Sequence, residues 1–473
     1  MNREHRLPDN EDMEDLLKVF ERLRTGRGGG FLSEESFERI IDHFDDQDAL
    51  PKAMEAADMG VLQFPYSASL LVKKADLLIA TRQYKQALEI LDKAEILDRN
   101  DIDIPILRTD AYLALDMQDK AVVLLEEAIL HFEGDERIDL LFELADVYDD
   151  YESFGKIFDC LKLILEYDPN NEEALYKICF WTDFTGRNEE SIQLHLKIIE
   201  EYPYNDLAWF NLAAAYQGLH LFEKAIDAYQ YAIAINEKFD YAYRNMADAL
   251  MRLHRYKEAI ESLEKVIELA RPEDLIYQAI GYCYEKIRNY AQARFYYRKA
   301  SHLNPDDARL YVKVAGTYMK EGKYLQAVKH LETALRIKRL DPEFNLMMGE
   351  CHVRLDKGKD AVHYFLSAVS AKPRNLKAWD ALIRVLFDEG QYGEADRQLQ
   401  MTRQRIGEKP VFAYYETAIL LVTGKVREGL ALLEKNIEQY PKQLKAFLKL
   451  YPSAVQFPQV VELILRWKRK KRS

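Results

Sequence analysis

Glycine and proline are scarce in this chain of 473 residues, with 19 and 14 residues, or about 4% and 3% against the usual 7% and 5%. This scarcity argues against collagen-like chains, low-complexity chains and turn-rich β architectures. Cysteine is also rare, and the four residues are far apart with no C-x-x-C pair among them: Cys160, Cys179, Cys283 and Cys351. Such spacing makes no disulfide framework, so we expect a reducing, cytoplasmic compartment.

Long apolar runs are missing as well. No run of 18 apolar residues occurs, so we expect no membrane span, and the N-terminus has no apolar stretch of signal-peptide length. Hydrophobic residues nevertheless make up 48% of the chain and charged residues 31%, which is typical of a folded protein rather than a disordered one.

Charge is distributed unevenly along the chain. Residues 1–200 contain 46 Asp and Glu against 22 Lys and Arg, whereas residues 201–473 contain 34 against 44. The first part therefore carries a balance of −24 and the second +10. An asymmetry of this kind affects the choice of partner and the rate of association more than the fold.

Sequence signatures of catalysis are also lacking. The chain has no H-E-x-x-H, no G-x-S-x-G and no G-x-x-x-x-G-K-[ST] segment. The glycine cluster GRGGG at 26–30 lacks the preceding strand that a phosphate-binding loop needs, so we interpret it as a linker. We therefore predict a protein that is not an enzyme and that has no catalytic residues, metal site or cofactor.

A repeat of 34 residues accounts for most of the chain. Alanine recurs at this interval in similar sequence frames, at positions 225, 259, 293, 327, 361 and 395. Each interval contains two amphipathic segments of about a dozen residues, with apolar residues three and four apart. A short helix pair cannot bury its apolar face alone, so such pairs stack on their neighbours. A small residue is expected where the two helices of a pair cross closely.

These repeats resemble the tetratricopeptide repeat family, in particular its long, multi-repeat bacterial type. Two segments match the family pattern best. Residues 206–239 do so through Trp209, Leu212, Ala213, Tyr216, Ala225, Tyr229 and Ala232. Residues 274–307 do so through Tyr277, Ile280, Gly281, Tyr284, Ala293, Tyr297, Ala300 and Pro305. The resemblance implies an all-α fold, an α-solenoid in which about twelve helix pairs form a right-handed superhelix with terminal capping helices.

The 34-residue register divides the chain into three parts. We predict an N-terminal helix and glycine-rich link at 1–33, and capping helices with a basic tail at 444–473. Between them lies the repeat array at 34–443, which we expect to be irregular near 129–171, where Ile157 replaces the usual alanine. Asn436 marks the last repeat as degenerate, and we expect the terminal KRKKRS segment to be disordered.

In this family the first helices of the pairs line a concave groove that binds partner segments. Transferring the groove positions to this chain gives a candidate set of exposed binding residues: Asn211, Tyr241, Arg244, Asn245, Asp248, Arg252, Tyr282, Lys286, Arg309, Lys313, Lys320, Arg354, Lys377 and Arg384. The family uses asparagines at this position to hold extended peptides, because an amide side chain both donates and accepts hydrogen bonds. Asn211 and Asn245 are therefore either peptide contacts or ordinary solvated polar residues. The chaperone-tail clamp of some family members has no counterpart here.

Two classes of function remain open from the sequence. The first is a cytoplasmic scaffold or adaptor whose groove binds another protein or peptide, in particular an extended acidic segment. The second is a nucleic-acid- or ribosome-associated factor that uses the basic C-terminal half, although its basic groove residues alternate with acidic ones. Self-association is a further possibility, and we expect no interaction with a membrane.

Overall fold

The structure, a computed structural model, describes residues 13–26, 31–271 and 273–470. These residues form α-helices and two short 3-10 helices, and no strand occurs among them. The prediction of an all-α fold is therefore confirmed. The predicted right-handed superhelix stays a prediction. The chain divides into two compact units, here called the N-terminal unit, which ends at Ala242, and the C-terminal unit, which begins at Tyr243.

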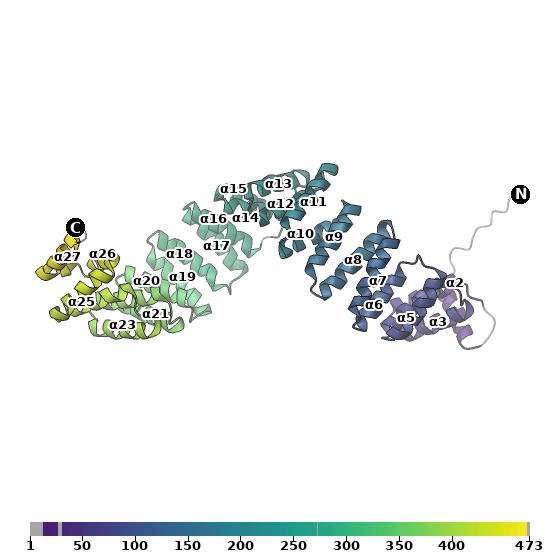
Figure 1. Ribbon diagram of the computed structural model, residues 1–473, viewed down its shortest axis with the longest axis horizontal. Helices are drawn as coiled ribbons and strands as arrows, with labels where there is room; N and C mark the ends of the chain where they lie inside the picture. The colour runs from purple at the N-terminus through teal and green to yellow at the C-terminus, as the bar shows by residue number, and fades with distance from the viewer. Residues whose placement is uncertain (1–12, 27–30, 272, 471–473) are drawn as a thin grey trace. The chain divides into compact units, whose positions relative to one another are not determined.

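The N-terminal unit contains a leading helix followed by consecutive helix pairs (Figure 1). The helices are α1 (Met13–Arg24), α2 (Glu34–Asp46), α3 (Leu50–Gln63), α4 (Ala68–Ala80), α5 (Tyr84–Leu97), α6 (Asp103–Ala114), α7 (Gln118–His131), α8 (Gly134–Asp150), α9 (Phe154–Tyr167), α10 (Glu172–Thr185), α11 (Asn188–Glu201), α12 (Asp206–Gly218) and α13 (Phe222–Ile235). The division between the units falls within α14 (Asp240–Arg252).

The C-terminal unit continues the pairs and ends in shorter elements. Its helices are α15 (Tyr256–Leu269), α16 (Asp274–Lys286), α17 (Tyr290–Leu303), α18 (Ala308–Lys320), α19 (Tyr324–Ile337), α20 (Pro342–Arg354), α21 (Gly358–Ala371), α22 (Leu376–Asp388), α23 (Tyr392–Ile406), α24 (Pro410–Val422), α25 (Val426–Gln439), η1 (Pro441–Gln443), α26 (Leu444–Leu450), η2 (Pro452–Gln456) and α27 (Pro458–Lys470).

Small residues allow the two helices of each pair to pack closely. The alanines that define the 34-residue interval, from Ala225 to Ala395, all have no exposed surface. A larger side chain at these positions would force the helices apart, because protein cores have little free volume. The 34-residue interval in the sequence therefore corresponds to the interval between successive close crossings of paired helices.

A left-handed residue joins the two helices of every pair. Glycine fills this position at Gly186, Gly322, Gly390 and Gly424. In the other pairs a non-glycine residue adopts a φ between 55° and 63°: Asp48, Arg82, Asp116, Glu152, His220, His254, Arg288 and Asp356. The turn therefore keeps one backbone conformation whether or not glycine is present, although this conformation costs other residues about 1–2 kcal/mol.

Both ends of the array are closed by additional helices. In the N-terminal unit, Leu16 and Phe20 of α1 join the core of α2 and α3. In the C-terminal unit, Phe447 of α26 and Ile464 of α27 join the core of the last helix pairs. Of the basic tail, residues 468–470 belong to α27, so the expectation of disorder is wrong for them. Residues 471–473, and residues 27–30 of the expected linker, lie outside the described part of the chain. The three-part division itself stays a proposal.

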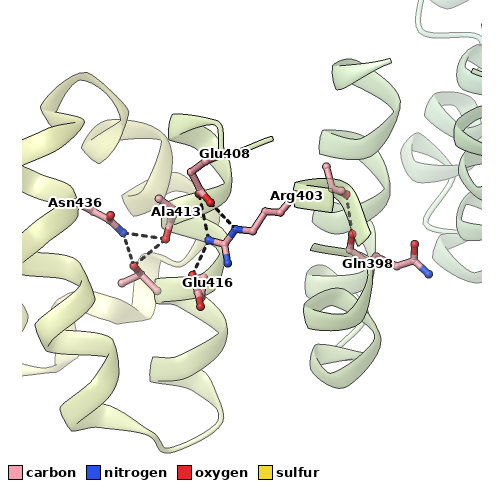
Figure 2. A network of polar contacts seen from close by, with 8 residues as sticks. Gln398, Arg403, Glu408, Ala413, Glu416 and Asn436 are labelled. Carbon is pink, nitrogen blue, oxygen red and sulfur yellow. Dashed lines mark hydrogen bonds and ion pairs between the residues drawn. The ribbon is translucent and has the colours of Figure 1, made fainter. Parts of the chain in front are cut away.

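Asn436, which marked the last repeat as degenerate, is a buried structural group. Its Nδ2 donates hydrogen bonds to the carbonyl of Ala413 over 2.9 Å and to Oγ1 of Thr417 over 3.0 Å (Figure 2). Beside it, the Arg403 guanidinium pairs with Glu408 at 2.9 Å and Glu416 at 2.6 Å. Polar contacts therefore join α23 to α24 and α24 to α25.

Candidate functional site

A cleft of about 310 Å³ lies on the side of the C-terminal unit formed by its first helices, here called the first-helix face. Three consecutive first helices, α14, α16 and α18, supply its lining: Asp248, Met251, Arg252, Gln278, Ala279, Tyr282 and Lys313. Four of these were predicted from the sequence, namely Asp248, Arg252, Tyr282 and Lys313. The structure thus brings together residues that are up to 65 positions apart in the sequence.

Three lining residues were missed from the sequence. Met251, Gln278 and Ala279 occupy groove positions of the same 34-residue register, but the candidate set favoured charged and aromatic side chains. Gln278 matters most of the three, because its Oε1 accepts a hydrogen bond of 2.6 Å from Nζ of Lys313. The 34-residue register alone is enough to place Gln278 on the first-helix face.

Lys313 is less accessible than the sequence analysis expected. Its side chain is half-buried, and Nζ also lies 5.6 Å from the centroid of the Tyr297 ring. Burial lowers the pKa of Lys313, while the carboxylates of Asp307 and Glu285 act in the opposite direction. Lys313 therefore forms part of the wall of the cleft, fixed by Gln278 on one side and an aromatic ring on another.

An aromatic edge borders the same cleft. The ring of Tyr282 is 41% exposed and packs edge-on against Tyr256, with ring centroids 6.2 Å apart. Nζ of Lys286 lies 4.9 Å from the centroid of the Tyr282 ring, a distance at which a cation is attracted to the ring face. The cleft thus offers an apolar surface beside positive charge.

Several of the predicted cations are paired with carboxylates. Arg244 contacts Glu273 at 3.2 Å, and Arg252 contacts Asp248 at 3.6 Å. Lys320 forms an ion pair with Glu285. Surface pairs of this kind contribute little to stability, about 0–1 kcal/mol, but they reduce the positive charge that a partner would meet at these three positions.

Further cations lie exposed on α18 and on the next two first helices, α20 and α22: Arg309, Arg354, Lys377 and Arg384. Two carboxylates lie among them. Burial raises the pKa of Glu350, and Lys377 and Arg354 oppose this increase. Burial likewise raises the pKa of Asp388, and the nearby Arg384 opposes this increase. The first-helix face of α18, α20 and α22 is therefore mixed in charge.

The two predicted asparagines differ in burial although they occupy the same register position. Asn211, in the N-terminal unit, is only 2% exposed, and its Nδ2 donates to the carbonyl of Leu175 over 2.7 Å. It does not lie open to a peptide as expected, because its amide joins α12 to α10. Asn245 of α14 is half-buried. Tyr241, also in the N-terminal unit, is 59% exposed.

The cysteine thiols lie in apolar packing. Burial raises the pKa of Cys160, Cys283 and Cys351 to about 12, and that of Cys179 to about 11. A thiol with so high a pKa stays protonated at neutral pH and is a poor nucleophile.

The described residues contain no group of three His, Cys, Asp or Glu arranged to hold a metal ion. Among these same residues, no helix has the length and apolar character needed to cross a membrane.

Comparisons with known proteins support the repeat assignment. Two sequence models of the tetratricopeptide repeat match the chain, one over residues 240–272 and the other over residues 287–351. These matches cover α14, α15 and α18 and thus much of the cleft. A comparison with curated protein sequences found no match.

Among solved structures, three are similar at low identity. The C-terminal part of a TPR repeat-containing protein from Cytophaga hutchinsonii is 14% identical, with 51% of this chain and 99% of that chain covered and a TM-score of 0.45. A tetratricopeptide repeat protein from Parabacteroides merdae is 18% identical, with 52% and 97% covered and a TM-score of 0.36. YrrB, described as a TPR protein with an unusual peptide-binding site, is 19% identical, with 40% and 96% covered and a TM-score of 0.35.

Proposed function

Since this chain is a tetratricopeptide-repeat protein, we propose that it is a non-catalytic scaffold that binds an extended acidic segment of another protein. The binding surface is the first-helix face of the C-terminal unit, and the residues that contact the segment are those of the candidate set that lie in this unit. Asn211 and Tyr241 are not part of this proposal.

The exposed cations on three successive first helices are the observation that carries the proposal. Arg309 lies on α18, Arg354 on α20, and Lys377 and Arg384 on α22. Hydrogen bonds from such cations to carboxylates are each worth about 1.5–3 kcal/mol when they are formed. A segment with several Asp or Glu residues would satisfy cations that neighbouring carboxylates only partly neutralise.

The cleft between α14, α16 and α18 gives this surface a place for one anchoring side chain. Its lining combines Tyr282 and Met251 with the charged residues Asp248, Arg252 and Lys313. Apolar walls with a few polar groups at fixed positions are typical of ligand-binding clefts. The cleft would hold an apolar side chain of the segment while neighbouring carboxylates pair with the cations.

The test compares reversed charges on two sides of the helix pairs. Random dodecapeptides displayed on phage are selected on the immobilised full chain, on Arg309→Glu/Lys377→Glu and on Lys265→Glu/Lys329→Glu. Arg309 and Lys377 lie in the first turn of their helices, where an acidic residue is favoured by the helix dipole, so both variants should keep the wild-type melting temperature. Lys265 and Lys329 are exposed on second helices and serve as the matched control.

We expect acidic peptides to be enriched on the wild type and on the control, and to be lost on Arg309→Glu/Lys377→Glu. Equal enrichment on all three proteins would overturn the proposal, because the first-helix face would then make no difference. Binding of a labelled RNA oligonucleotide that depends on Arg309 and Lys377, without any acidic peptide, would also overturn it.

We also propose a cytoplasmic location. The four cysteines are free thiols, and three of them are buried, which suits a reducing compartment. Fractionation with an antibody against the chain tests this proposal, and recovery with secreted proteins would contradict it.

A further inference from the structure

An exposed aromatic stripe lies on α10 in the N-terminal unit. Tyr176, Phe180 and Phe184 follow one another at four-residue intervals and therefore share one face of the helix. Their side chains are 63%, 60% and 57% exposed. A soluble protein seldom exposes neighbouring large apolar side chains in this way, and such patches are typical of interaction surfaces.

Neighbouring rings hold the stripe in place. The Phe154 ring, at the start of α9, packs edge-on against Phe184 with centroids 4.9 Å apart and stacks on Trp181 at 5.4 Å. Phe180 packs edge-on against Trp181 at 5.0 Å and lies 5.9 Å from Phe184. A partner would meet rings that are already ordered, so binding would lose little side-chain entropy.

A column of carboxylates leads along the preceding first helices towards this stripe. Glu143 of α8 is half-buried, whereas Asp76 of α4 and Asp110 of α6 are exposed. The charge of Asp76 raises the pKa of Asp110, and the charge of Asp110 raises the pKa of Glu143. Desolvation is the larger cause of the raised pKa in all three, and Asp146 adds to the effect at Glu143. The negative charges of neighbouring carboxylates in the column therefore repel one another.

A cation–π contact joins α8, which carries Glu143, to α10, which carries the stripe. Nζ of Lys177 lies 4.9 Å from the centroid of the Phe142 ring, next to Glu143 in the sequence. Lys177 is also paired with Glu173 at 2.7 Å. At the other end of α10, Asp183 is exposed beside Phe184. Helix α10 therefore carries an acidic residue near each end of the aromatic stripe, Glu173 and Asp183.

We propose that the N-terminal unit binds a basic segment of another protein on this surface. Bulky apolar side chains of the segment pack on Tyr176, Phe180 and Phe184, and its Lys or Arg side chains pair with the carboxylates of the column. Charge complementarity selects this occupant over an acidic peptide or an anionic lipid surface, both of which the carboxylates would repel. The site is separate from the one proposed for the C-terminal unit and prefers the opposite charge.

The test uses the same random dodecapeptide library on the immobilised full chain. Selection is repeated on Phe180→Ser/Phe184→Ser, on Asp110→Asn/Glu143→Gln and on the control Tyr66→Ser/Tyr204→Ser. The control removes two aromatic rings that are 83% and 84% exposed in the same unit but lie outside the stripe. Enriched peptides are then titrated by fluorescence anisotropy, with the melting temperature of each variant measured beside the wild type.

We expect a class of peptides with Lys or Arg and at least one Phe, Trp or Leu. Their affinity should fall at least tenfold for both site variants, remain unchanged for the control, and decrease with added salt. If the selection yields no acidic peptides but still yields basic ones, only the function proposed for the C-terminal unit is contradicted. The present inference is overturned if no basic class is enriched, or if that class binds Phe180→Ser/Phe184→Ser as well as the wild type. It is also overturned if sedimentation shows a homodimer that this variant abolishes, since the occupant would then be a second copy.

Discussion

Gly281 lies directly against the ring of Tyr297: a β-carbon added at Gly281 would stand 2.6 Å from Cδ1 of that ring. The ring itself is almost fully buried, and its hydroxyl donates a hydrogen bond of 2.9 Å to Oε2 of Glu285. It therefore has little room to move away. This contact is the close crossing of α16 and α17 that the small residue was expected to permit.

Gly281→Ala should therefore destabilise the C-terminal unit by about 1–3 kcal/mol, the usual cost of overpacking a core. Gly316 is the matched control, because it also lies inside a helix, α18, but a β-carbon there would meet no atom within 4 Å. Gly316→Ala should stabilise the unit by up to about 1 kcal/mol through helix propensity. Urea unfolding measures both changes, and a destabilising Gly316→Ala would show that the helix register is misassigned.

The left-handed turn gives a second prediction. Arg288 is exposed and has a φ of 63°, whereas the equivalent residue of the next pair is Gly322 with a φ of 73°. Arg288→Gly should stabilise the C-terminal unit by up to about 1 kcal/mol, because the β-carbon is strained in this conformation. Gly322→Ala should destabilise it by a similar amount. Thermal melts compare the two, and shifts in the same direction would contradict the argument.

Periodicity predicted the helix pairs because close crossings require the same small residue at every repeat. The conformation of the turns was only partly predictable. Gly186 and Gly322 signal a left-handed residue in the sequence, but Arg82 or Arg288 carries no such signal. There the backbone follows the packing of the two helices, which overrides the local preference of the residue.

The candidate site shows a similar limit. The 34-residue register correctly placed Tyr282 and Lys313 on the first-helix face, because the position of a residue within a helix fixes the face on which it lies. Register could not separate Asn211 from Asn245, since the difference depends on the carbonyl of Leu175 in another repeat. Phe180 of the aromatic stripe also occupies a groove position, but the candidate set begins at Asn211 and leaves out the repeat that contains Phe180.

Asn436 gives a third prediction, in the last helix pair. Asn436→Ala would leave the Thr417 hydroxyl without its buried donor and would remove one of the donors to the Ala413 carbonyl, which also accepts from Oγ1 of Thr417, so we expect a loss of about 1–3 kcal/mol. Thr417→Val removes one of the two contacts and should cost less. In a double-mutant cycle the two changes should show a coupling of at least 0.5 kcal/mol, as roughly expected for residues in one network. Additive losses would mean that the two side chains do not interact.

Glu143 gives the fourth prediction, which concerns pH. Burial and the nearby Asp110 and Asp146 raise the pKa of Glu143 from 4.5 to about 7 in the folded chain. Between these two values the folded state binds more protons than the unfolded state, so this group makes the N-terminal unit less stable as the pH rises through 7. Glu143→Gln cannot ionise and should escape this loss. At pH 8 we expect the variant to be more stable by about 1 kcal/mol, less than the full pKa shift implies because the side chain is partly exposed.

Hydrogen exchange in α6 and α8 measures this difference within the N-terminal unit. Protection of these helices should be greater in Glu143→Gln than in the wild type at pH 8, and the two proteins should converge near pH 4.5, where Glu143 is protonated in the folded state. Glu152→Gln is the control, since Glu152 is exposed in the turn that follows α8, and it should leave the wild-type pH dependence unchanged. If Glu143→Gln gains the same protection at both pH values, its effect would come from packing and not from ionisation of the carboxyl.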